Sequence, residues 1–494
     1  MELQYTHPPR KETKLMISCF FSRVNPWGWG RHPSSVPLQR PHLAELAANE
    51  SNLPQFVQDC PVAMKYLGLL GPLDWANFPE RPTNRAWPGP TPQPRAPFVA
   101  AYLVKLNEQK KYMSDLRAYL VEHPALVWLL GFHLKADPKT SYGFDPAASV
   151  PSRKQLGRVL RDLDNQMVQF LLSSTVKLIQ AELPAEIDFG QEVSIDTKHI
   201  LAWVKENNPK AYVKEADRLN KTRQPAGDGD CKLGCKKKSN QQLDQPQSNN
   251  QAKKRATQFS CDQYFWGYNS GLAGTKVAGY GEVALAELTQ TFDKGDTTFF
   301  FPLMTATEAR LGFQPPFGAA DAAFEAWYVF DYFHQAGGFA AIPKTNRKPL
   351  ERLFDPQGLP LCQAGLAMPC KSTFINNRGL RPQQMGRYGC PLLFPQPTAD
   401  ACPIDHKAWP HGGCELKMGT SVGARTRYLL DRDSQSYKAL YNQRTATERI
   451  NAQAKALGIE RPKLRNLQAI ANLNTLIYVL INLRTLHRIR AQAA

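Results

Sequence analysis

The stretch PPFGAADAAFEAWYVFDYFHQAGGFAAIPKTNRK, residues 315 to 348, changes its hydrophobic pattern twice. A short apolar run reaches Asp321, and a helical pattern then covers about 322 to 335 and stops at two glycines. A second apolar run, FAAIP, leads into Lys344 and Arg347. This succession of strand, helix and strand predicts an α/β fold in which both strands belong to one sheet.

Strand patterns also precede this unit. In QEVSIDTK the apolar residues predict a strand that ends at or near Asp196. Residues 264 to 292 are strand-like, and residues 299 to 313 have the pattern of a helix. The succession of strand and helix patterns is typical of an α/β fold, with Asp196 and Asp321 at strand ends. Carboxylates at such positions occur both in metal sites and in turns.

The segment YNQRTATERINAQAK, residues 441 to 455, predicts an amphipathic helix. A helix turns about 100° per residue, so four chemically active side chains share one polar stripe roughly 60° wide: Tyr441, Arg444, Glu448 and Lys455. The opposite face would pack on a core through Ala446, Ile450, Ala454 and Leu457. The polar stripe alone is equally compatible with a solvated face of paired charges and with a functional site.

Net charge narrows the choice of partner. The 494 residues include 61 Lys and Arg against 43 Asp and Glu, a formal charge of +18 that favours a polyanion. Nucleic acid is the leading candidate and an acidic membrane surface the second. The longest apolar run near the C-terminus, LIYVLI at residues 476 to 481, is too short to span a bilayer, and no secretion signal is present, so we expect a cytoplasmic protein.

The N-terminal part divides into two regions by pattern. Residues 1 to 95 are rich in Pro and Trp and predict irregular structure with short helices, whereas residues 96 to 185 predict a helical domain. In the helix predicted to follow Ser152, the apolar stripe consists of Leu156, Val159, Leu160, Leu163 and Met167. Basic side chains lie largely away from that stripe, so we expect this domain to contact DNA, although a solvated basic face has the same pattern. The apolar segment near the C-terminus, residues 464 to 490, predicts a helix that packs in the protein core.

Residues 186 to 490 form the largest predicted domain, and two inserted segments interrupt it. Residues 206 to 258 form a basic insertion, expected to be flexible and to contact DNA backbone, and its CKLGC sequence is not read as a zinc site. Residues 345 to 420 form a Cys-rich insertion with Cys362, Cys370, Cys390, Cys402 and Cys414, together with His406 and His411. This insertion lacks the close cysteine pairs of most zinc sites, so the sequence favours buried free thiols over a structural Zn²⁺.

Three carboxylates on separate elements suggest metal chemistry: Asp196, Asp321 and Glu448. Two divalent ions roughly 3.5 to 4 Å apart need carboxylates that converge from different elements, and two Mg²⁺ ions, or Mn²⁺, fit that donor set. Asp331 is a rival for the second position, but it falls inside the predicted helix. Asp296 is a weaker rival, which reads as a helix N-cap.

At these residues the chain resembles the DDE transposases of bacterial insertion sequences, in the group with a Tyr-Arg-Glu-Lys signature. The signature corresponds to Tyr441, Arg444, Glu448 and Lys455, SIDTK resembles the first-Asp strand, and GAADAAFEAWYVFDYF resembles the second-Asp region. The resemblance implies that residues 186 to 490 form an RNase H-like catalytic domain, with a mixed sheet flanked by helices, in which Asp196, Asp321 and Glu448 bind the metal ions. It assigns DNA contacts to Tyr441, Arg444 and Lys455, and IPKTNRK, with Lys344 and Arg347, resembles the basic strand end that follows.

This resemblance implies metal-dependent cleavage of DNA at the ends of an insertion sequence, followed by strand transfer of the freed 3′-hydroxyl into target DNA. It also implies a homo-oligomer that pairs two transposon ends on DNA. Two alternatives remain open: a transposase-derived DNA-binding protein without catalysis, and an RNase H-like nuclease that cuts without joining.

Overall fold

The computed structural model describes residues 43–80, 93–236, 263–345, 352–398 and 400–493. These residues belong to one compact unit that starts at residue 41. The helices of residues 96–185 therefore pack in the same unit as the sheet that follows them. Arg347 and residues 237–258 of the basic insertion lie outside the described residues.

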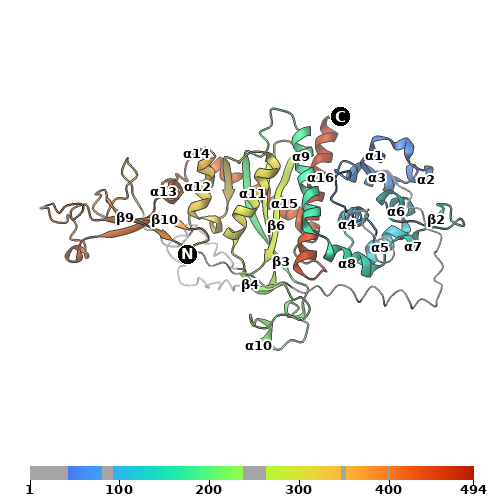
Figure 1. Cartoon of the computed structure of the whole chain (residues 1–494), viewed down its shortest axis with the longest axis horizontal. Helices are drawn as coiled ribbons and strands as arrows, with labels where there is room; N and C mark the ends of the chain where they lie inside the picture. Colours follow the sequence, from blue (N-terminus) through green and yellow to red (C-terminus); the bar gives the residue numbers. More distant parts are fainter. Residues whose placement is uncertain (1–42, 81–92, 237–262, 346–351, 399, 494) are drawn as a thin grey trace, which may run out of the picture. The chain divides into compact units, whose positions relative to one another are not determined.

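A six-stranded mixed sheet forms the centre of this unit (Figure 1), with strands in the order β4-β5-β3-β7-β8 and β6 paired to β5. The strands are β3 (Glu192–Leu201), β4 (Lys232–Lys236), β5 (Gln263–Val277), β6 (Gly281–Thr291), β7 (Phe317–Ala320) and β8 (Phe339–Ala341). Neighbours β3, β5 and β6 run antiparallel, whereas β3, β7 and β8 run parallel. The parallel step from β7 to β8 needs a crossover, which α12 (Trp327–Gln335) supplies. The predicted α/β class and mixed sheet are confirmed.

Glycines in the strands let helices approach both faces of the sheet. A Cβ on Gly274 of β5 would lie 2.7 Å from Ile450 of α15 (Thr445–Ala456), whereas one on Gly271 would lie 2.3 Å from Phe299, just before α11 (Phe300–Leu311). Since side chains alternate along a strand and these glycines are three residues apart, α15 and α11 cover opposite faces. Helix α14 (Gln435–Asn442) contacts β7 and β8.

Most of the N-terminal part is helical. Its elements are α1 (Leu43–Ala48), η1 (Glu50–Asn52), α2 (Gln55–Gln58), α3 (Pro61–Leu70), α4 (Ala96–Asn107), α5 (Met113–Glu122), α6 (Pro124–Leu130), β1 (Lys135–Ala136), β2 (Phe144–Asp145), α7 (Pro146–Ser149), α8 (Arg153–Asp162) and α9 (Asn165–Glu182). Ser152 caps α8 as predicted, its hydroxyl accepting from the Gln155 N–H. The single helix predicted from this point is wrong, because Asp164 caps a second helix, α9.

The C-terminal helix α16 (Leu467–Ala493) lies beside α9 and β6 (Figure 1). Asn482 of α16 donates to the Ala284 carbonyl at 2.9 Å and accepts from the Ala284 N–H at 2.8 Å. Thr485 donates to the Glu282 carbonyl at 3.0 Å. These side chains satisfy backbone groups of β6 on the side away from β5, so α16 closes this sheet edge.

Helix α16 is also long and apolar enough to cross a membrane, but 89% of its apolar window is buried inside the fold. Its packing matches the predicted role as a core helix.

The predicted end of the first strand is wrong. Strand β3 does not end at Asp196 but continues to Leu201, because its second half pairs with β5 over residues 267–271. In the described part of the basic insertion, residues 206–236, the buried Asp228 accepts from the Tyr268 hydroxyl at 2.8 Å and β4 extends the sheet. Short elements η2 (Lys205–Asn207) and α10 (Glu215–Arg218) precede β4.

The Cys-rich insertion has a sheet of its own, with antiparallel strands in the order β11-β10-β9. These strands are β9 (Cys370–Asn376), β10 (Gln383–Gly389) and β11 (Glu415–Gly419), with η5 (Trp409–His411) between the last two. The buried apolar cluster of this sheet consists of Met368, Tyr388 and Met418. Helix α13 (Val422–Leu429) then returns the chain to α12.

Candidate active site

The register of the parallel strands brings two of the predicted carboxylates side by side. Ile195 of β3 pairs with Ala320 of β7, so Asp196 and Asp321 are the next residues along two adjacent strands. Asp321 follows the last residue of β7 and caps η4 (Ala322–Phe324), its carboxylate accepting from the Ala323 N–H at 3.0 Å. Both carboxylates therefore stand on rigid backbone at one point of the sheet.

Burial and mutual repulsion make these carboxylates difficult to ionise. Burial raises the pKa of Asp196 to about 6, and the charge of Asp321 adds to the rise, against hydrogen bonds from the Thr197 N–H and from Asn451. Burial also raises the pKa of Asp321, with a contribution from the charge of Asp296. Two carboxylates held close in a partly buried place favour a bound cation, since it would offset the cost of their ionisation.

Helix α15 packs directly over Asp196. Its apolar side is buried as predicted, with Ala446, Ile450 and Ala454 at most 1% exposed. Asn451, on the same buried side, donates from Nδ2 to Asp196 Oδ2 at 2.9 Å, and its Oδ1 is buried without a hydrogen-bond partner. Asn451 was not among the site residues predicted from the sequence. Its position, three residues after Glu448 on the same helix, was the available signal.

Arg444 is the cation that faces all three predicted carboxylates. It forms an ion pair with Glu448 at 2.6 Å, and its guanidinium carbon lies 5.6 Å from the centre of the Tyr441 ring. Burial alone would lower the pKa of Arg444, but Tyr441, Glu448, Asp196 and Asp321 together raise it. The guanidinium thus supplies positive charge where Asp196 and Asp321 repel each other.

The signature residues do not lie on one continuous helix. Tyr441 belongs to α14, and a turn at Gln443 and Arg444 separates it from α15. The predicted stripe is correct for Arg444 and Glu448, which are one helical turn apart. Tyr441 reaches the same place from the end of α14, where its ring stacks on Tyr437.

Lys455 lies farther along the α15 surface, beside Glu460. The Lys455 ammonium is 3.7 Å from Glu460, which also pairs with Lys198 at 2.6 Å. Lys198 comes two residues after Asp196 on β3 and so faces the same side of the sheet. Lys198 was not among the predicted site residues, although the two-residue alternation of a strand places it on the same face as Asp196.

The strand end after β8 carries Lys344, which is exposed to solvent. The next residue, Thr345, is anchored by Glu325, whose side chain is 5% exposed and accepts from the Thr345 N–H at 2.9 Å and hydroxyl at 2.7 Å. Arg347, the second predicted DNA contact here, lies outside the described residues.

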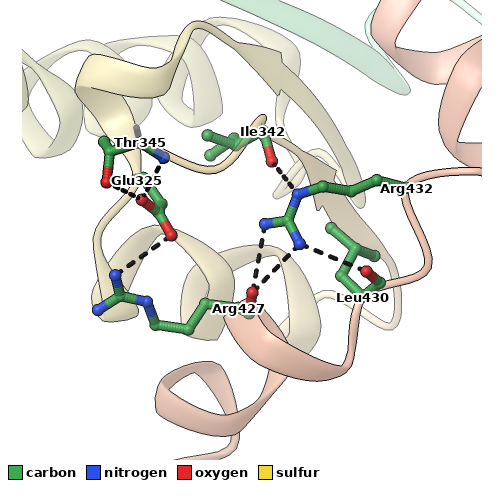
Figure 2. Close-up of polar contacts among 6 residues, drawn as sticks. All are labelled: Glu325, Ile342, Thr345, Arg427, Leu430 and Arg432. Carbon is green, nitrogen blue, oxygen red and sulfur yellow. Dashed lines mark hydrogen bonds and ion pairs between the residues drawn. The ribbon is translucent and has the colours of Figure 1, made fainter. Parts of the chain in front are cut away.

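Figure 2 shows how the two ends of the Cys-rich insertion meet at Glu325. Arg427 of α13 forms an ion pair with Glu325 at 3.2 Å, opposite the bonds from Thr345. Arg432 donates from Nε to the Ile342 carbonyl at 3.0 Å. Burial would raise the pKa of Glu325, but the bonds from Thr345 and the charge of Arg427 lower it. The insertion is therefore joined to the sheet through an ionised carboxylate.

The two rival carboxylates have other partners. Asp331, inside α12, accepts from the backbone N–H of Gly423 and so holds the start of α13. Asp296 is not a helix cap, because Gly295 occupies the cap position of η3 (Asp296–Phe299). Asp296 instead accepts from the Thr197 hydroxyl at 2.9 Å, next to the Asp196 and Asp321 pair.

The donor chemistry fits a hard divalent cation at Asp196 and Asp321, since both offer carboxylate oxygens. Arg444 is the protein cation whose charge acts on both of them. Glu448, the third predicted ligand, is not joined to the two aspartates in a common metal-binding group. Its carboxylate is bonded to Arg444, and the described residues contain no group of three ligands already in metal-binding geometry.

Comparison of the chain with protein-family models, curated proteins and solved structures finds no match.

Proposed function

We propose that this protein is a DDE transposase that cleaves DNA at the ends of an insertion sequence and joins the freed end to target DNA. The observation that carries the proposal is the register of β3 and β7, which sets Asp196 beside Asp321 under α15. Both carboxylates are partly buried with raised pKa values, and the signature Arg444 acts on both, a combination that favours a functional site over a pair of solvated surface charges.

The strand arrangement supports the same proposal. Antiparallel β6, β5 and β3 are followed by parallel β7 and β8, with helices on both faces. This is the arrangement expected of the RNase H-like domain that the resemblance implies. In it the first carboxylate stands on the central strand and the second at the end of its parallel neighbour, as Asp196 and Asp321 do.

In the proposed site Asp196 and Asp321 would hold Mg²⁺, and Glu448 would complete the set when Arg444 turns to a DNA phosphate. Bound divalent cations supply two effects: a lower pKa for the attacking water or hydroxyl, and neutralisation of charge on the reacting phosphate. Asn451 would hold the Asp196 carboxylate in one orientation. Arg444, once released from its ion pair with Glu448, would suit bidentate binding of that phosphate.

DNA would approach along the face that carries Asp196. Lys198 and Lys455 continue that face beyond the carboxylates, and the signature Tyr441 lies at the opposite side of Arg444. A tyrosine at this place can stack on a base displaced near the cut. The net charge of the whole chain, +18, also favours DNA as the partner.

The experiment is a joining assay with the full chain, Mg²⁺, a supercoiled plasmid, and DNA fragments taken from both flanks of the coding sequence. The proposal expects joined products from the wild type and none from Glu448→Gln, which should still bind the fragments. Asp188→Asn, which changes an exposed carboxylate outside the site, is the matched control and should join normally.

Cuts without joined products would show a nuclease, and fragment binding without cuts would show a DNA-binding protein. Either result overturns the proposal, as does Mg²⁺-dependent joining by Glu448→Gln.

A further inference from the structure

Four cysteines that are far apart in the sequence line one small cavity of the Cys-rich insertion. They are Cys362, Cys390, Cys402 and Cys414. Apolar side chains of Leu366, Leu392 and Ile404 complete much of the lining. Cys390 is buried and the other three are partly buried. The remaining cysteine of this region, Cys370, is exposed on β9 and does not line the cavity.

The strand register fixes two of these cysteines opposite each other. Gly389 of β10 pairs with Glu415 of β11, so Cys390 and Cys414 are the next facing positions just beyond the two strands. Gly413, with φ of +83°, makes the approach possible, because a Cβ there would lie 2.5 Å from the Cys390 Cβ. Burial raises the pKa of Cys414 to about 11, and the neighbouring Cys390 and Cys362 add to the rise.

The other two cysteines stand in tight turns. The Cys362 carbonyl accepts from the Gly365 N–H at 3.0 Å, and its own N–H donates to the Leu366 carbonyl at 2.9 Å. The Cys402 carbonyl accepts from the Asp405 N–H at 3.2 Å. Turns that present a cysteine toward a shared centre are common in small metal-stabilised modules, since the metal replaces a hydrophobic core.

The Cys-rich insertion has too small a hydrophobic core to be stable by packing alone. Its buried cluster contains three residues, Met368, Tyr388 and Met418, while β9 is exposed along most of its length. A module of this size with so small a core is stabilised in most cases by disulfides or a metal. The irregular backbone between β10 and β11 also needs another source of stability, because regular hydrogen bonding does little to offset the entropy lost when it becomes ordered.

We propose that Cys362, Cys390, Cys402 and Cys414 bind one structural Zn²⁺ as a tetrathiolate. Each thiol gives up its proton, so binding releases four protons and leaves a centre with two net negative charges. The described residues contain no group of three or more His, Cys, Asp or Glu side chains placed to hold a metal ion, so the four sulfurs would have to move closer together on binding. Close cysteine pairs are absent from the sequence, because strand pairing brings Cys390 to Cys414 and separate turns bring Cys362 and Cys402 to the same cavity.

His406 also lines the cavity but is not among the proposed ligands. Its Nδ1 accepts from the Ala408 N–H at 3.1 Å, so the neutral ring carries its proton on Nε2. Neither nitrogen then has a free lone pair for the metal. This distinguishes a four-cysteine site from one with three cysteines and a histidine.

The test is the zinc content of the purified full chain, measured by mass spectrometry of the metal and by the colour of the cobalt-substituted protein. We expect about one zinc per chain for the wild type and near zero for Cys402→Ser. Cys370→Ser, the matched control, and His406→Ala should both retain zinc, and cobalt should give the absorption of a tetrahedral thiolate site.

Three results would overturn the proposal: a zinc-free wild type reduced throughout purification, zinc retained by Cys402→Ser, or zinc lost from His406→Ala. An intact-protein mass showing a Cys390 to Cys414 disulfide in the native chain would also overturn it. None of these outcomes depends on whether the protein joins DNA, so the zinc site and the proposed function fail separately.

Discussion

The central sheet is covered by helices on both faces, whereas the sheet of the Cys-rich insertion leaves β9 exposed almost throughout. Around the central sheet, apolar side chains from α9, α11, α15 and α16 join one continuous buried core. The insertion has a separate cluster of three buried residues. The buried core is thus continuous around Asp196 and Asp321, whereas the proposed zinc would supply the stability that the small cluster of the insertion lacks.

The largest expected effect is on chemistry at the packed sheet. Asp321→Asn removes one charge from the carboxylate pair without changing its size, so we expect DNA cleavage to fall by about 10³-fold or more. The rate of end cleavage in Mg²⁺ measures this effect, with Asp188→Asn as control. A loss below tenfold would show that Asp321 is not part of the site.

Removing core volume should distinguish the two regions. Ile450→Ala leaves a cavity between α15 and Gly274, and we expect the free energy of unfolding to fall by about 2 to 5 kcal/mol. Met418→Ala should destabilise the insertion alone. Hydrogen exchange followed by mass spectrometry measures both, because each region gives its own peptides. Equal loosening of β3 by both variants would contradict separate cores.

A smaller effect is expected at Asn451, a positioning residue. Its hydrogen bond lowers the pKa of Asp196, so Asn451→Ala should raise that pKa and move the acid limb of the cleavage profile to higher pH. We expect about a tenfold lower rate at neutral pH. Asn442→Ala, at an exposed position at the end of α14, is the control. A lower rate with an unmoved profile would show a structural role only.

The smallest effect is on stability in the absence of divalent ions. The folded-state pKa of Asp196 is raised to about 6, so its stabilising contribution is full below the ordinary pKa of an Asp and is lost as pH rises through 6. Asp196→Asn mimics the neutral form and should raise the apparent melting midpoint by about 2 to 5 °C at pH 8. Near pH 4 the difference should nearly vanish. A constant difference from pH 4 to 8 would contradict the raised pKa.

The sequence was informative where a pattern is local. The strand before Asp321, the helix after it and the buried side of α15 could be read from periodicity, because burial follows a period of two or 3.6 residues. The end of β3 could not, since the strand continues only because β5 supplies a partner for residues beyond Asp196. The break between α14 and α15 carries no Pro or Gly, so no local signal reveals it.

Long-range pairings account for the other omissions. Asn451 and Lys198 acquire their positions from the packing of α15 on β3, which one segment alone does not specify. In the cysteine cluster, Cys390 and Cys414 face each other only through the register of β10 and β11, while turns elsewhere in the insertion place Cys362 and Cys402. The sequence lacks the close cysteine pairs that usually indicate a zinc site, so only the spatial cluster of cysteines points to one.

The most direct measurement of the proposed active site uses Fe²⁺ in place of Mg²⁺, because iron-generated hydroxyl radicals cut the polypeptide next to the bound metal. With zinc first loaded into the cysteine site, we expect cuts in three segments, around Asp196, Asp321 and Glu448, and their loss in Asp196→Asn. An absence of cuts near Asp196 and Asp321, or cuts that persist in Asp196→Asn, would contradict a metal site at the junction of β3, β7 and α15.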